Sequence, residues 1–62
     1  MVNTLKEWFI VSFEKYIVIC GFIYNDAKNR FADGAFIHTS KVVKVDFSSR
    51  VVQTLNTIYN LE

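Results

Sequence analysis

The sequence contains no proline, one cysteine, one histidine and two glycines in its 62 residues. A lone cysteine cannot form a disulfide within the chain, and one cysteine with one histidine falls short of a structural zinc site. Two isolated glycines exclude a glycine-rich phosphate-binding loop. Since a chain of this length has a marginal core of its own, we expect association with another chain to supply what cross-links and metals do not.

The sequence also has no marked excess of either positive or negative charge. Seven basic and six acidic residues are scattered along the chain and give a net charge of +1, which argues against duplex DNA as a partner. The apolar stretch 8–24 approaches the length that spans a membrane, but Glu14 and Lys15 lie in its middle. A charge at the bilayer centre costs roughly 2.5–3.5 kcal/mol on insertion scales, so we predict no transmembrane helix and no membrane partner.

Short runs of β-branched and aromatic residues occupy most of the chain after residue 15. Their spacing predicts a mainly β protein, a small antiparallel curled sheet or barrel of about five strands. We expect a single domain over 1–62, with an apolar N-terminal extension at 1–15 and a β core at 16–62. The predicted strands are 16–25, 35–39, 41–47, 50–56 and 58–61.

The stretch 16–24 is apolar on both faces and should be covered on both. Within it, Gly21 indicates a bulge or bend, and Cys20 reads as a small buried hydrophobe. In the strand 41–47, strict alternation predicts two faces. One would carry Val43, Val45 and Phe47, and the other Val42, Lys44 and Asp46.

The N-terminal segment supports two interpretations. Thr4 and Glu7 have the spacing of a helix capping box. The stretch 8–13 is instead rich in the β-branched and aromatic residues that favour strands. A short helix and an extra strand both remain open for residues 1–13.

Residues 25–34 form a polar, turn-rich connection ending in Asp33-Gly34, a strong turn signal. We expect Phe31 to lie beneath this loop as its apolar anchor. Arg30 has two interpretations: it pairs with Asp26 or Asp33 to hold the loop, or it forms a binding hot spot with Phe31.

The residues give little support for catalysis. His38, the single imidazole, is followed by Thr39 and Ser40, but adjacent strand residues point to opposite faces. His38 and Thr39 therefore cannot act together as base and nucleophile. Asp26 and Asp33 are interpreted as loop residues. We predict no enzyme, no catalytic residue, no metal site and no cofactor.

Three short motifs occur in order over residues 20–62: Arg30-Phe31-Ala32-Asp33-Gly34, then Thr39-Ser40-Lys41-Val42, then Thr54-Leu55-Asn56-Thr57-Ile58-Tyr59-Asn60-Leu61. They resemble the "R-F-x-D-G", "T-S-x-V" and "T-x-N-[ST]-x-Y-x-L" motifs of small phage and prophage β proteins. The resemblance implies a compact all-β domain of phage origin. Small phage proteins of this size include anti-defence inhibitors of the anti-CRISPR and anti-Hachiman type.

The leading hypothesis is accordingly a phage-encoded protein, located in the host cytoplasm, that binds a host defence protein and inhibits it by occupancy. Loops presented by a rigid scaffold are common recognition sites. The expected partner-binding residues are Arg30, Phe31, Asp33 and His38.

The alternative hypothesis is a small barrel that binds single-stranded nucleic acid by stacking bases on its aromatic rings. The residues that would carry this activity are Phe22, Tyr24, Phe36 and Tyr59, with Arg30, Lys41, Lys44 and Arg50.

The apolar excess also predicts a homodimer, the commonest oligomer. The N-terminal extension lies outside the three motifs and is the expected interface. Its candidate residues are Trp8, Phe9, Ile10 and Phe13.

Overall fold

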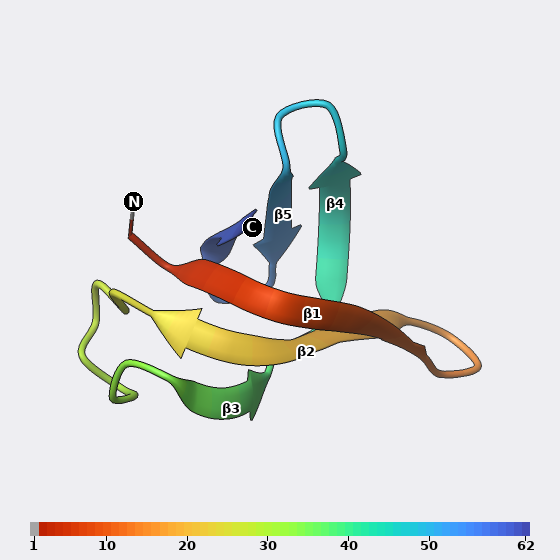
Figure 1. Cartoon of the computed structure of the whole chain (residues 1–62). Helices are drawn as coiled ribbons and strands as arrows, with labels where there is room; N and C mark the ends of the chain where they lie inside the picture. Colours follow the sequence, from red (N-terminus) through yellow and green to blue (C-terminus); the bar gives the residue numbers. More distant parts are fainter. Residues whose placement is uncertain (1) are drawn as a thin grey trace.

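The computed structural model describes residues 2–62 and contains six strands joined in one sheet (Figure 1). The prediction of a mainly β curled sheet is confirmed, and each of the five predicted strands is present with slightly different ends. The strands are β1 (Thr4–Ser12), β2 (Ile17–Tyr24), β3 (Ala35–His38), β4 (Val42–Asp46), β5 (Val51–Thr54) and β6 (Ile58–Leu61). The described residues contain no helix long and apolar enough to cross a membrane.

The strand order is β3-β2-β1-β6-β5-β4, with β3 and β4 at the two ends of an open sheet. Four ladders are antiparallel, and the ladder between β1 and β6 is parallel. The parallel ladder joins the two halves of the sheet through Thr4 and Leu5. The β4–β5 hairpin crosses the β1–β2 hairpin at a steep angle, so that the two halves enclose a common interior (Figure 1).

Residues 4–12 of the N-terminal segment form a strand, so the helical interpretation of this segment is wrong; Met1 lies outside the described residues. The β-branched and aromatic residues of this strand gain burial in the sheet that a lone helical turn could not supply. Thr4 and Leu5 are both buried between β2 and β6. This sixth strand accounts for the difference from the predicted number.

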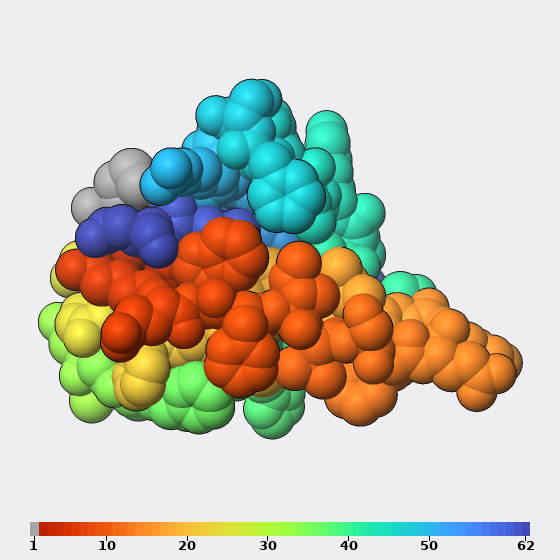
Figure 2. Space-filling model, turned by 45° about the vertical axis from the view of Figure 1, so that its right-hand side comes forward, coloured from red at the N-terminus to blue at the C-terminus, as the bar shows by residue number. Residues whose placement is uncertain are grey.

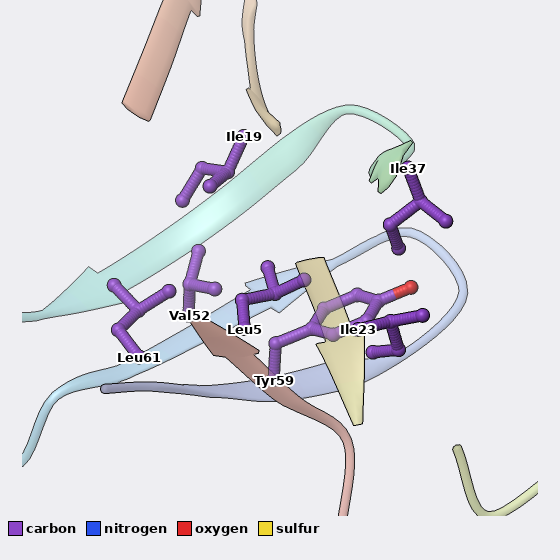
Figure 3. Packing of buried hydrophobic residues seen from close by; sticks show 7 residues of the cluster. All are labelled: Leu5, Ile19, Ile23, Ile37, Val52, Tyr59 and Leu61. Carbon is purple, nitrogen blue, oxygen red and sulfur yellow. The ribbon is translucent and has the colours of Figure 1, made fainter. Parts of the chain in front are cut away.

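The core lies on the concave face of the sheet and draws on five of the six strands. Leu5 on β1 faces Ile23 on β2, and Val52 on β5 faces Tyr59 on β6. The buried cluster consists of Leu5, Ile19, Ile23, Ile37, Val52, Tyr59 and Leu61 (Figure 3). Tyr59 and Leu61 therefore lie on the same, buried face of β6.

The alternation predicted for residues 41–47 is wrong, because β4 contains an irregularity between Val42 and Lys44. The extra residue, Val43, is exposed, while Val42 and Val45 both pack against the core. A bulge shifts the side-chain parity by one residue, which brings Val42 to the same face as Val45.

Gly21 lies opposite a second bulge, in β1 rather than in its own strand. Lys6 pairs with Phe22 and Phe9 with Cys20, so Glu7 and Trp8 together oppose Gly21. Glu7 has a φ of +50°, which lets the strand take up the extra residue. A Cβ on Gly21 would lie 3.1 Å from Trp8 Cβ and 3.2 Å from Lys6 O. The glycine thus permits β1 and β2 to approach each other closely.

Replacing Gly21 by alanine is expected to lower the free energy of unfolding by roughly 1–3 kcal/mol, the usual cost of overpacking. The neighbouring Cys20→Ala variant, altered on the opposite face, should have the smaller effect. Urea denaturation of both variants measures the difference. Equal stability of Gly21→Ala and the wild type would contradict the close approach.

Candidate functional site

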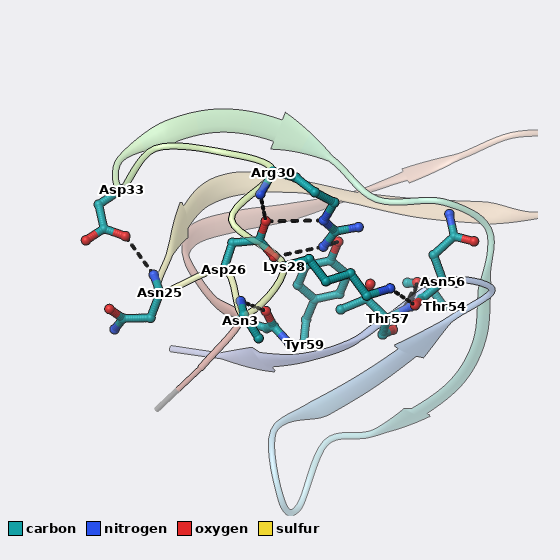
Figure 4. A network of polar contacts seen from close by, with 11 residues as sticks. Asn3, Asn25, Asp26, Lys28, Arg30, Asp33, Thr54, Asn56, Thr57 and Tyr59 are labelled. Atoms are coloured by element: carbon teal, nitrogen blue, oxygen red, sulfur yellow. Dashed lines mark hydrogen bonds and ion pairs between the residues drawn. The ribbon is translucent and has the colours of Figure 1, made fainter.

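The loop between β2 and β3 is organised by the buried carboxylate of Asp26. Asp26 Oδ2 accepts hydrogen bonds from Arg30 N at 2.7 Å and Arg30 Nε at 3.2 Å. Asp26 Oδ1 accepts one from Arg30 Nη2 at 2.9 Å, which completes a bidentate ion pair (Figure 4). Arg30 Nη2 also lies 3.5 Å from the hydroxyl of Tyr59 in the core. The first interpretation of Arg30, as the residue that holds the loop, agrees with this geometry.

The pair perturbs both ionisable groups. Hydrogen bonds from the Arg30 side chain lower the pKa of Asp26 from 3.8 to about 2, against the opposing effect of burial. The same hydrogen bond raises the pKa of Arg30 further above its ordinary value. Both groups therefore stay charged across the physiological range.

Further hydrogen bonds fix the two ends of the loop (Figure 4). Asp33 Oδ1 accepts a bond of 2.7 Å from the amide of Asn25, whose φ is +56°. Asn3 Oδ1 accepts one of 2.9 Å from the amide of Ala27. The carboxylate of Asp33 thus holds the two ends of the loop together, through a bond to a residue eight positions earlier and not within the Asp33-Gly34 turn itself.

The expectation that Phe31 anchors the loop from beneath is wrong. Its side chain is exposed, with 39% of the residue's surface accessible. The buried side chain of this loop is instead Asp26, with its bonds to Arg30. The guanidinium of Arg30 lies over the ring of Phe31 at 5.4 Å from its centroid and supports it on the surface.

Strand β3, which follows this loop, is an edge strand. The amide of Thr39 donates to Ile19 O at 2.8 Å just beyond the strand. Because antiparallel ladder bonds alternate, the backbone groups of Phe36 and His38 point away from β2. No other strand of the described residues pairs with this side of β3. It therefore presents free donors and acceptors to an incoming strand.

A hollow of about 360 Å³ runs along this open edge. Its lining consists of Phe31, Ala35, Phe36, Ile37 and His38. The structure thus brings together two of the four expected partner-binding residues, Phe31 and His38. The other two, Arg30 and Asp33, lie in the same loop but are engaged in holding it.

Phe36 is the ring at the centre of this surface, and sequence reasoning did not place it there. It is 55% exposed and lies on the convex face of the sheet. Its ring centroid is 5.2 Å from that of Phe22 and 6.1 Å from that of Phe9. The period-two pattern located Phe36 and His38 on one face, but the contact with Phe9 depends on the β1–β2 register, which no local signal encodes.

A second hollow, of about 490 Å³, lies beside the β1–β2 hairpin. Its lining includes Phe13, Tyr16, Cys20, His38 and Ser40. Its character is mainly apolar, since Val11 and Val18 also border it. Cys20 is half-buried on the convex face rather than in the core.

The hydroxyl that follows His38 in the sequence, that of Thr39, is engaged in the fold. The hydroxyl of Thr39 is buried and occupied, since it accepts a bond from Ile19 N at 3.0 Å and donates to Ser40 O at 2.8 Å. Residues 2–62 contain no cluster of three or more His, Cys, Asp or Glu side chains that could bind a metal ion.

The residues of the nucleic-acid hypothesis do not share one surface. Tyr59 is buried in the core, whereas Phe36 is exposed on the convex face. Lys44 lines a hollow on the β4–β6 half, and Arg50 lies in the turn between β4 and β5. Lys44 and Arg50 therefore lie on the other half of the sheet from Phe22 and Phe36.

The expected dimer residues lie along β1 but on different faces. Phe9 is on the convex face opposite Cys20, and Ile10 is on the concave face opposite Ile19. Trp8 is half-buried and packs against the core. Phe13 lies at the end of the hairpin, where its ring is 5.0 Å from that of Tyr16.

Comparison of the chain with protein-family models, curated proteins and solved structures found no match.

The ion pair makes a prediction for Arg30→Ala. Removing the guanidinium leaves the buried carboxylate of Asp26 without its main partner, at a cost of about 1–3 kcal/mol in the free energy of unfolding. Thermal and urea denaturation measure the loss. The control is Lys28→Ala, which changes another residue of the same loop and removes an exposed hydrogen bond from Lys28 Nζ to Asn56 O. Its free energy of unfolding should be close to that of the wild type.

A pH titration tests the same pair independently. Because the pKa of Asp26 is depressed in the folded state, its stabilising contribution is complete above the ordinary value of 3.8 and is lost as pH falls through about 2. The stability advantage of the wild type over Arg30→Ala should therefore shrink between pH 4 and 2. Asp46, whose pKa is lowered by the Ser48 hydroxyl, is common to both proteins and cancels. A constant advantage over this range would exclude the pair as its source.

Proposed function

We propose that the chain is a phage-encoded binding protein that occupies a surface of a host protein, an anti-phage defence component, and inhibits it without catalysing a reaction. The observation that carries the proposal is the open edge of β3 beside the hollow lined by Phe31, Phe36 and His38. The phage origin rests on the resemblance of the three motifs.

The two ends of the sheet differ in a way that supports this assignment. The β4 end has a bulge at Val43 and carries Lys44 and Asp46, the devices by which proteins prevent edge-to-edge pairing. Strand β3 has no bulge, no charge and no proline in Ala35–His38. An unprotected edge flanked by exposed rings is suited to specific pairing with a partner strand.

The surface is also preorganised. Arg30 holds the loop through Asp26 and supports the ring of Phe31 from behind. Phe36 is held by contacts with Phe9 and Phe22. Side chains that are already ordered lose little entropy on binding, and rigid aromatic anchors of this kind dominate binding energy at interfaces. Arg30 and Asp33 thus contribute by positioning, and Phe31 and His38 by contact.

The test uses two exposed phenylalanines as a matched pair. Phe31→Ala removes a ring from the proposed surface, and Phe47→Ala removes another exposed ring, even more accessible, at the β4–β5 turn. Both variants should keep the melting temperature of the wild type. Partner protein captured from a bacterial host lysate should be lost with Phe31→Ala, by about 2 kcal/mol of affinity or more, and kept with Phe47→Ala.

Equal capture by the two variants would contradict the assignment of the surface. The salt dependence of the captured complex tests the class of partner. A steep loss as salt rises, with nucleic acid in the eluate, would instead indicate the nucleic-acid hypothesis.

A further inference from the structure

Strand β1 has a second open edge, on the side away from β2. Its parallel ladder with β6 involves only Thr4 and Leu5. The rest of the strand, as far as Ser12, continues beyond β6 with β2 as its single neighbour among the described strands. Figure 2 shows the end of this hairpin, in orange, projecting from the body of the molecule.

The hydrogen-bond parity identifies which residues face this edge. The amide of Phe13 donates to Tyr16 O at 2.8 Å, so the backbone of Phe13 points toward β2. Val11 and Phe9 lie two and four residues earlier in the same ladder and therefore point toward β2 as well. In an antiparallel ladder the intervening residues point the other way. Ile10 and Ser12 therefore direct their backbone groups to the open side, and both residues are exposed.

We propose that this edge of β1 binds the same edge of a second copy of the chain, antiparallel, about a two-fold axis at Val11. In this register Ile10 of one copy forms a hydrogen-bonded pair with Ser12 of the other, so every outward backbone group of the two residues is used. The two sheets then continue into each other through β1. The proposal does not depend on the function proposed for β3.

The side chains are self-complementary in that register. On the convex face, Phe9 lies opposite Phe13 of the second copy, and Val11 lies opposite its own equivalent. Phe9 and Phe13 are each 50% exposed in the single chain. Aromatic pairs directly across an antiparallel ladder are favourable. Pairing would therefore cover two of the most exposed rings of the N-terminal half.

Parity and rings both favour a second copy over an unrelated strand, which would not carry this palindromic pattern.

The first test is the mass in solution. The wild type should have a light-scattering mass of twice 7.2 kDa, and Ser12→Ala should keep it. Ser12→Pro removes the outward amide, in addition to fixing φ at this position, and should weaken self-association at least tenfold, since two hydrogen bonds related by the two-fold axis are lost. A wild-type mass of 7.2 kDa at millimolar concentration would overturn the proposal.

The second test reads the register by disulfide formation in a Cys20→Ala background, so that its outcome does not depend on the stability of Ser12→Pro. Val11→Cys alone should cross-link with itself, because a non-hydrogen-bonded pair at the axis has a Cα separation of about 4.5 Å. Phe9→Cys and Phe13→Cys should each remain unlinked alone, since equivalent positions lie about 14 Å apart along the strands. A mixture of the two should cross-link.

Phe36→Cys in the same background is the matched control on the other open edge. A dimer that cross-links through Phe36→Cys but not through Val11→Cys would place the interface at β3 and reject the β1 pairing.

Discussion

The two halves of this sheet are joined by one short parallel ladder. Asn60 N donates to Asn3 O at 2.8 Å, and Glu62 N donates to Leu5 O at 2.9 Å. Leu5, which accepts the second of these bonds, is fully buried and belongs to the core cluster. Without this ladder, β1–β3 and β4–β6 would be separate three-stranded sheets with one exposed apolar face each. The core therefore depends on strands from opposite ends of the sequence.

The loop that precedes β3 depends on a second long-range arrangement, of polar groups rather than apolar ones. Asp26 is buried because the loop folds over it, and it is tolerated there because Arg30 supplies two side-chain bonds and a backbone bond. A buried carboxylate without such partners would be strongly unfavourable. The same contacts determine where Phe31 is displayed.

Much of the fold could be predicted from local patterns. Continuous apolar character identified β2, and alternation identified β3 and β6, because each of these strands keeps a regular pleat. The same rule failed in β4, where the bulge at Val43 changes the parity. It also left residues 1–13 undecided, since burial of Thr4 and Leu5 between two distant strands, and not local propensity, settles their conformation.

The candidate surface was predictable only in part. The residue types of Phe31 and His38 singled them out, and both border the hollow at β3. The side chain of Phe31 is exposed while that of Asp26 is buried, and this choice is made by the packing of the whole structure. That Phe36 stacks on Phe9 and lies at an open edge follows from strand order. Neither fact has a signature within a few residues of sequence.

The ladder between β1 and β6 has a kinetic consequence. Thr4 pairs with Asn60, close to the greatest sequence separation that 62 residues allow. Contacts of such high order form late, because the entropy of closing the chain must be lost before they contribute. During synthesis the β1–β2 hairpin emerges with all its rings long before β6 exists. The nascent chain thus presents its most apolar segment while that segment has no C-terminal partner, the circumstance in which chaperones and premature association compete with folding.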